Sequence, residues 1–103
     1  MVHTASPFPL KPPRHENDLI HPAVNGTIAV MKACHQNKVK RVVITSSVAA
    51  IMYVPPAEVP LDGHFTEKIW SNPVGDHIAA YAKSKTLAEQ AAWDFQKALP
   101  LEE

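Results

Sequence analysis

Apolar residues occur along this chain in two patterns, a helical repeat and short continuous runs, which predict two helices and two strands. Between about residues 17 and 36 an apolar side chain returns every three or four positions, as on one face of a helix: Leu19, Ile20, Val24, Ile28 and Met31. A second helix is predicted from about 76 to 98, where small residues dominate the apolar face. Asn17 or Asp18 could cap the first helix, and Asp76 could cap the second.

The strands are short and rich in β-branched residues. One is predicted at about residues 1–5, and the other, at about 40–46, is a basic entry followed by an apolar run that ends in hydroxyls. Such a continuous apolar run is typical of a buried parallel strand. A strand, helix, strand, helix order predicts the α/β class, as a partial, doubly wound parallel sheet with about two strands and two main helices. A sheet of two strands leaves edges open, so we expect self-association or a completing partner.

Composition limits the class of protein more than it identifies a function. The chain is 46% hydrophobic and 19% charged, with a formal net charge of zero. A neutral balance argues against a nucleic-acid or anionic-membrane partner, since both favour a basic surface. No apolar run approaches the ~20 residues of a membrane helix, and the N-terminus lacks the pattern of a signal peptide. We therefore expect a cytoplasmic protein.

Cysteine and histidine contribute little chemistry to this sequence. The single cysteine, Cys34, excludes an internal disulfide and suits a reducing compartment. The six histidines show no paired spacing of the kind that a zinc site uses. No metal site is expected.

Tyr81 and Lys85 are the residues with the clearest chemical potential. Four positions apart on a predicted helix, they share one face. A tyrosine hydroxyl in water has a pKa of about 10, so proton transfer near neutral pH requires a stabilised phenolate. The charge of Lys85 could supply that stabilisation. Ser46 and Ser47 follow the second strand, at the sheet edge where ligands of open α/β sheets bind.

Four stretches of this sequence together resemble one protein family. They are Val2-His3-Thr4-Ala5-Ser6-Pro7, Pro22-Ala23-Val24-Asn25-Gly26-Thr27, Val42-Val43-Ile44-Thr45-Ser46-Ser47, and Tyr81-Ala82-Lys83-Ser84-Lys85 with the eight residues that follow. Their order and spacing are similar to the extended short-chain dehydrogenase/reductases of the epimerase/dehydratase superfamily. The residues after Lys85 resemble the dihydroflavonol reductase and cinnamoyl-CoA reductase branch in particular, and argue against an epimerase or dehydratase.

The resemblance implies a catalytic role for three residues. Tyr81 would protonate the carbonyl oxygen of a substrate, and Lys85 would bind the nicotinamide ribose and stabilise the phenolate. Ser47, preferred over Ser46, would hold the carbonyl oxygen. Lys83 faces elsewhere on the helix.

The resemblance also implies a set of cofactor-binding residues and a substrate loop. Thr4, Ala5 and Ser6 match the family segment that passes beside the cofactor. Tyr81 and Lys85 would also bind the cofactor. The cofactor would be NADP or NAD, with NADP favoured by the branch. The stretch from Phe65 to Ser71 resembles a loop near the substrate pocket, although loop packing explains it equally well.

The dinucleotide fingerprint of this family, a glycine-rich turn between a strand and a helix, has no counterpart here, because the three glycines are widely scattered. We expect residues 1–103 to form the central part of a Rossmann-like reductase domain, without the N-terminal glycine-rich βαβ unit and the C-terminal substrate-binding region. Two hypotheses stay open. One is an NAD(P)-dependent oxidoreductase acting on a small carbonyl or alcohol; the other is a non-catalytic remnant or interaction module, inactive by itself.

Overall fold

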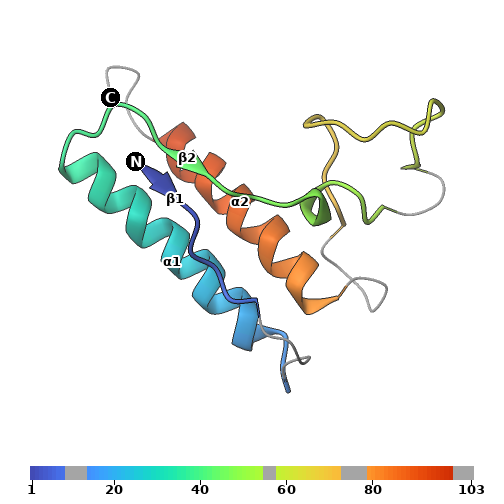
Figure 1. Cartoon of the computed structure of the whole chain (residues 1–103), viewed down its shortest axis with the longest axis horizontal. Helices are drawn as coiled ribbons and strands as arrows, with labels where there is room; N and C mark the ends of the chain where they lie inside the picture. Colours follow the sequence, from blue (N-terminus) through green and yellow to red (C-terminus); the bar gives the residue numbers. More distant parts are fainter. Residues whose placement is uncertain (9–13, 55–57, 73–78, 99–103) are drawn as a thin grey trace.

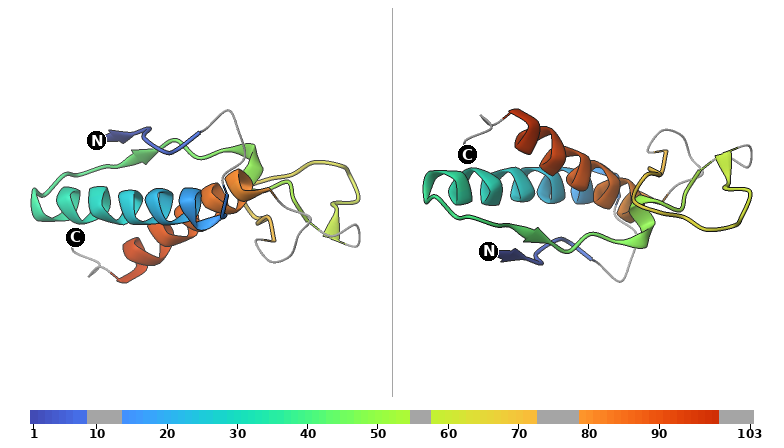
Figure 2. Two further views of the ribbon diagram at one scale, coloured as in Figure 1. Left: turned by 90° about the horizontal axis from the view of Figure 1, so that it is seen from below. Right: turned by 90° about the horizontal axis from the view of Figure 1, so that it is seen from above.

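Two long helices form one layer of the molecule, and two short parallel strands lie against that layer (Figures 1 and 2). The computed structural model describes residues 1–8, 14–54, 58–72 and 79–98. Strand β1 is Val2–His3, and β2 is Val43–Ile44. The helices are α1, Asn17–Gln36, and α2, Ala80–Ala98.

The order of the elements confirms the predicted partial Rossmann-type α/β fold. A crossover through α1 connects β1 to β2, and the two strands pair in parallel. Both helices run in the same direction, opposite to the strands (Figure 1). A short 3₁₀ helix, η1 (Val48–Ala50), follows β2 and was not predicted. The long connection from η1 to α2 extends to one side of the helices (Figures 1 and 2).

The strands are shorter than their apolar patterns predicted. Val2 pairs with Val43 and His3 pairs with Ile44, and hydrogen bonds continue this ladder slightly beyond both ends. The N-terminal ammonium donates to the carbonyl of Arg41 at 3.0 Å, and the Thr45 amide donates to the carbonyl of His3 at 2.9 Å. Pairing needs two adjacent extended segments, so the ladder ends where either segment turns away.

Within the part of the chain that the structure describes, only one face of the two-stranded sheet is covered. The helices lie on the side of His3, which is buried, whereas Val2 is 66% exposed and Val43 is 59% exposed (Figure 2). Successive residues of a strand point to opposite faces, so these two paired valines form an apolar patch on the open face. The prediction of a buried strand was therefore wrong for β2, because burial requires a layer on both faces.

Small residues allow the helices to approach one another, and α1 with α2 forms the largest contact between elements. The buried side chains of the two helices are Leu19, Ile20, Ala23, Thr27, Cys34, Ala82, Ser84, Lys85, Thr86, Ala88 and Ala92. Two of these carry hydroxyls that bond within α2. Ser84 donates to the carbonyl of Tyr81 at 2.6 Å, and Thr86 donates to the carbonyl of Ala82 at 2.8 Å. Bonding in this way removes the cost of burying the hydroxyls.

The helix ends differ from the predicted caps. Glu16, rather than Asn17 or Asp18, occupies the N-cap of α1, and its side chain makes no hydrogen bond to the helix. The Asp18 carboxylate instead accepts from the backbone amide of His15 at 3.4 Å. The second helix begins at Ala80, and Asp76 lies outside the described residues.

The C-terminal end of α1 is closed by its backbone. Lys38 adopts the left-handed conformation with a φ of 55°, and the next amide, that of Val39, donates to the carbonyl of Cys34 at 2.9 Å. This arrangement is common where helices end, although glycine usually occupies the left-handed position. It directs the chain from α1 into β2.

Candidate functional site

Lys85 extends from α2 to the end of β2. Its side chain is buried, with 7% of the residue exposed, and Nζ donates a hydrogen bond to the Thr45 carbonyl at 3.2 Å. Thr45 directly follows β2, so the ammonium lies at the carboxyl end of the sheet, where ligands of open α/β folds bind. Burial disfavours the charged form and lowers the pKa of Lys85 from its ordinary value of 10.5. An ammonium with few acceptors in this position is suited to binding an oxygen-rich ligand.

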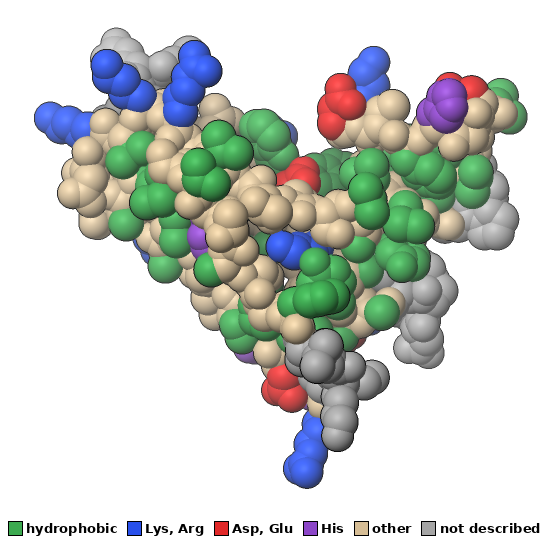
Figure 3. All heavy atoms as spheres, viewed as in Figure 1, with side chains coloured by type: hydrophobic (Ala, Val, Ile, Leu, Met, Phe, Trp, Pro, Cys, Tyr) green, Lys and Arg blue, Asp and Glu red, His purple; other side chains and the backbone are tan. Residues whose placement is uncertain are grey.

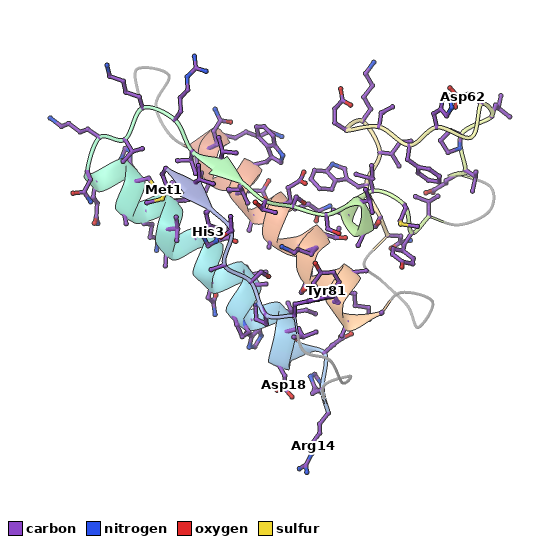
Figure 4. All side chains as sticks on the ribbon, viewed as in Figure 1. Met1, His3, Arg14, Asp18, Asp62 and Tyr81 are labelled. Carbon is purple, nitrogen blue, oxygen red and sulfur yellow. The ribbon has the colours of Figure 1, made fainter. Side chains whose placement is uncertain are left out.

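Tyr81 lies in the first turn of α2, on the side from which Lys85 also projects. The tyrosine is half-buried, and its ring packs against that of Phe8, with centroids 4.7 Å apart and planes tilted by 58°. In Figure 4 the labelled Tyr81 lies beside the segment that leaves β1. A tilted pair at this separation is favourable and restricts the orientation of the phenol. No sequence pattern identifies Phe8 as a neighbour of Tyr81, since it lies in an irregular segment 73 positions away.

Ser47 forms the N-cap of η1. Its backbone is extended, and its Oγ accepts a hydrogen bond from the Ala49 amide at 3.1 Å. Ala49 packs against Ala82 of α2, and Tyr53 and Tyr81 pack against this pair. The structure thus brings the segment that carries Ser47 against the turn of α2 that carries Tyr81.

The segment after β1 passes the same end of the sheet. Thr4 and Ala5 are exposed, whereas the Oγ of Ser6 is buried and has no hydrogen-bond partner among the described residues. The Oγ of Ser46, which lies two residues after β2, is also buried and has no hydrogen-bond partner among the described residues. A buried hydroxyl without a partner costs free energy, so it is well placed to accept or donate when a ligand binds. These atoms fit a ligand with hydroxyl and phosphate groups, as a nicotinamide cofactor has.

Lys83 is directed away from these residues, as its position on the helix predicted. It forms an ion pair with Glu16, with 2.5 Å between Nζ and Oε2, and so connects the N-terminal ends of α1 and α2. The hydrogen bond from Lys83 holds the pKa of the Glu16 carboxyl below its ordinary value of 4.5. This pairing also explains why the Glu16 side chain does not cap α1.

Comparison with known proteins places these residues in a family. Residues 1–95 match the sequence model of the 3-beta hydroxysteroid dehydrogenase/isomerase family, which is almost the whole chain. The chain belongs to this family. The match confirms the resemblance to the extended short-chain dehydrogenase/reductases.

Individual members of the family indicate the branch. An anthocyanidin reductase of Vitis vinifera is 42% identical over 104 residues, covering 92% of this chain and 29% of the relative. A cinnamoyl-CoA reductase of Medicago truncatula is 41% identical over 104 residues, covering 94% of this chain and 30% of the relative. Both support the predicted reductase branch.

A solved structure of the family supports the fold. The Gre2 protein of Candida albicans, crystallised with NADPH, superimposes with a TM-score of 0.76 and 34% sequence identity. The alignment covers 97% of this chain and 31% of the Candida protein. This member of the 3-beta hydroxysteroid dehydrogenase/isomerase family thus spans about 30% of the length of the relatives it matches.

Ser71 is a further residue that shapes this region, and it was predicted only as the last residue of the loop from Phe65 to Ser71. It is 1% exposed, its hydroxyl donates to the Ala49 carbonyl at 2.7 Å, and its Oγ accepts from the Tyr53 amide at 2.9 Å. The Ser71 amide also donates to the Ala50 carbonyl at 2.7 Å. The hydrogen bonds of Ser71 therefore hold the long connection against η1, next to Ser47. No periodicity or motif identifies it, because its partners lie about 20 positions away.

The described residues contain neither a group of metal-ligating side chains nor a membrane-spanning helix. Within residues 1–8, 14–54, 58–72 and 79–98, no three His, Cys, Asp or Glu side chains gather as metal ligands would. In the same ranges neither helix has the length and hydropathy needed to cross a membrane.

Proposed function

We propose that this chain carries the proton-handling part of an NAD(P)-dependent reductase site for a small carbonyl or alcohol substrate. Tyr81 donates a proton to the carbonyl oxygen in reduction and accepts it in the reverse direction. Ser47 holds the same oxygen by a hydrogen bond. The observation that carries the proposal is the buried ammonium of Lys85 at the end of β2, on the helix face that also carries Tyr81.

Lys85 has two roles in this proposal. Its positive charge stabilises the phenolate form of Tyr81 after proton transfer, since opposite charges at short range favour the ionised form. Its remaining donors bind hydroxyls of the ligand. The bond to the Thr45 carbonyl fixes the ammonium at the sheet edge and leaves other N–H groups for these contacts.

The cofactor we propose is NADP or NAD, with Thr4, Ala5, Ser6, Tyr81 and Lys85 as the residues that hold it. Thr4 and Ala5 are exposed, which allows close approach of a ligand, and Ser6 offers a buried hydroxyl that has no partner among the described residues. When bound, the nicotinamide supplies the hydride. NADP is favoured by the branch that the chain resembles, and the Candida protein was crystallised with NADPH.

We further propose that residues 1–103 act as the central part of a larger reductase domain. The sequence has three glycines and no glycine-rich turn of the kind that binds a pyrophosphate. The chain by itself is therefore expected not to retain a cofactor, which is the alternative of a non-catalytic remnant or interaction module. Titration of the purified chain with NADPH and with NADH, followed by nicotinamide fluorescence, tests this expectation. Binding at micromolar affinity would contradict it.

A chimeric enzyme tests the catalytic assignment of Tyr81. Residues 1–95 of this chain would replace the matched segment of the Candida Gre2 protein, whose fold it shares. In an active chimera, Tyr81→Phe is expected to lower turnover by about 10²-fold or more, the usual range for a lost general acid. NADPH affinity should change little, because the phenyl ring and its contact with Phe8 remain.

Tyr53→Phe is the matched control in the same chimera. It also removes a phenol hydroxyl, and Tyr53 packs against the same alanine pair as Tyr81. Turnover should stay within a few-fold of the unmodified chimera. Normal turnover in the Tyr81→Phe chimera would refute the assignment of Tyr81 as proton donor.

A further inference from the structure

The short helix η1 depends on groups outside it for the position of its C-terminal end. Hydrogen bonds within the turn use the carbonyls of Ser47 and Val48 as acceptors. The last carbonyls of any helix need partners from elsewhere. For Ala49 and Ala50 that partner is Ser71, whose hydroxyl donates to the first carbonyl and whose amide donates to the second, both at 2.7 Å. One residue of the long connection therefore holds both carbonyls.

The hydroxyl of Ser71 has no proton left for a ligand. Its one proton is donated to the carbonyl of Ala49, and its Oγ accepts from the amide of Tyr53 at 2.9 Å. Ser71 is 1% exposed, and hydrophobic side chains gather over η1 and the connection that follows it (Figure 3). Hydrogen bonds in such surroundings are strong and costly to leave unmade. Any effect of Ser71 on a reaction must therefore pass through the backbone that it holds.

That backbone determines what the side chain of Ser47 offers to a substrate. The Oγ of Ser47 accepts a hydrogen bond from the amide of Ala49 at 3.1 Å. A serine hydroxyl has one proton and two lone pairs, so this bond uses a lone pair and leaves the proton to be donated elsewhere. The amide and the carbonyl of Ala49 flank one Cα atom. The bond from Ser71 to that carbonyl thus also limits rotation of the amide that orients Ser47.

The same alanine sets the distance between η1 and the helix that carries the tyrosine. Ala49 packs against Ala82 of α2, and Tyr81 packs against this pair. Tyr81 itself is held by its helix and by its ring contact with Phe8. A displacement of η1 therefore moves Ser47 relative to a tyrosine that stays in place. Misplacement of a reacting group by about 1 Å can cost about 10²-fold in rate.

We propose that Ser71 is a positioning residue of the carbonyl-reducing site and that it acts through Ser47. Its bonds to Ala49 and Ala50 fix η1, so that Ser47 keeps its bond to the Ala49 amide. The proton of Ser47 is then directed to the carbonyl oxygen that Tyr81 protonates. This role rests on the proposed function, because Ser71 serves the same site.

A double-mutant cycle in an active chimera with the Candida Gre2 protein tests this role. Ser71→Ala is expected to lower kcat about tenfold or more and to leave the KM for NADPH within about twofold. Ser47→Ala should lower kcat by at least as much. Because Ser71 acts through Ser47, the double variant should match Ser47→Ala within about twofold. A double variant that loses the product of the two separate factors would overturn the proposal, as would a normal kcat for Ser71→Ala.

Thr86→Val is the matched control in this chimera. Thr86 is 0% exposed, and its hydroxyl also donates to a backbone carbonyl, that of Ala82 within α2, at 2.8 Å. Its kcat should stay within a few-fold of the unmodified chimera, and a loss equal to that of Ser71→Ala would overturn the positioning role. Normal turnover in both Ser47→Ala and Tyr81→Phe would instead refute the reductase assignment itself.

Native-state hydrogen exchange of the complete, unmodified chain tests the same coupling without any substitution. The amide of Ala49 is bonded to Ser47, and the amide of Tyr53 is bonded to Ser71. If Ser71 holds η1, both amides exchange through one opening event, with protection factors that agree within about threefold and fall in parallel in urea. An Ala49 amide that exchanges at least about tenfold faster than that of Tyr53 would show that η1 opens without release of Ser71. That result would overturn the proposal.

Discussion

At the residue scale, Lys85 carries a buried ammonium whose burial costs stability. Its ammonium is buried with one backbone acceptor, and burial lowers its pKa from 10.5. A group whose folded-state pKa lies below its unfolded-state pKa destabilises the fold at lower pH, where both states are protonated. The penalty decreases as pH rises from the folded-state pKa towards 10.5. A position that only supported the fold would favour an apolar side chain.

Lys85→Met is expected to raise the free energy of unfolding at pH 7. The difference from the unmodified chain should shrink as pH rises towards 10.5, because the lysine is then buried without charge. Urea unfolding at pH 7 and at pH 10 measures both values. Lys83→Met is the matched control and should lower stability, since it breaks the ion pair with Glu16. A less stable Lys85→Met variant at pH 7 would show that the bond to Thr45 outweighs the cost of burial.

Lys38 is a second residue whose conformation predicts an effect. Its φ of 55° is in the left-handed region, which costs an ordinary side chain roughly 1 kcal/mol and costs glycine little. Lys38→Gly is expected to raise the free energy of unfolding by about 0.5–1 kcal/mol, measured in urea. Lys40→Gly provides the comparison, because Lys40 does not have a positive φ, so the same added flexibility should be destabilising there. Equal effects of both glycines would contradict this account of the helix end.

At the element scale, Ser71 controls how the long connection meets η1. Ser71→Ala removes the bonds to the Ala49 carbonyl and from the Tyr53 amide, both in a buried region. Leaving these groups without partners should lower the free energy of unfolding by about 1–3 kcal/mol. Amide exchange at Tyr53 should accelerate, which hydrogen-exchange NMR detects. Thr66→Ala, at an exposed position of the same connection, should change Tyr53 exchange little.

At the scale of the whole molecule, the open face of the sheet determines how the chain behaves in solution. Val2 and Val43 are paired across the strands and both are largely exposed. Exposed apolar patches on sheets favour association. The double variant Val2→Glu and Val43→Lys places opposite charges on this pair, and should reduce light scattering and dye binding by the chain.

The stability of that double variant should stay within about 0.5 kcal/mol of the unmodified chain, because the replaced side chains face solvent. Val59→Lys changes an exposed valine of the long connection and serves as the control. It should leave scattering unchanged. Equal reductions in the two proteins would show that association does not involve the open face.

The sequence by itself determined the two long helices, the order of helices and strands along the chain, and the family. These features depend on residues close together in the chain: the helical period of 17–36, the β-branched run before Ser46, and the spacing of Tyr81 from Lys85. Local patterns specify which residues share a helix face, so the sequence alone distinguishes the side of Lys85 from that of Lys83. The helix caps and strand ends predicted from the same patterns were inaccurate, since both depend on neighbours outside the element.

Tertiary structure alone decided what each candidate residue contacts. The partner of Lys85 is a carbonyl 40 positions away, the ring beside Tyr81 belongs to Phe8, and Ser71 joins two loops. It also decided that, among the described residues, one face of the sheet is covered by the helices and the other is open. Sequence periodicity specifies the direction of a side chain relative to its own element. The atom that it meets depends on how distant elements pack, and that packing is a property of the whole fold.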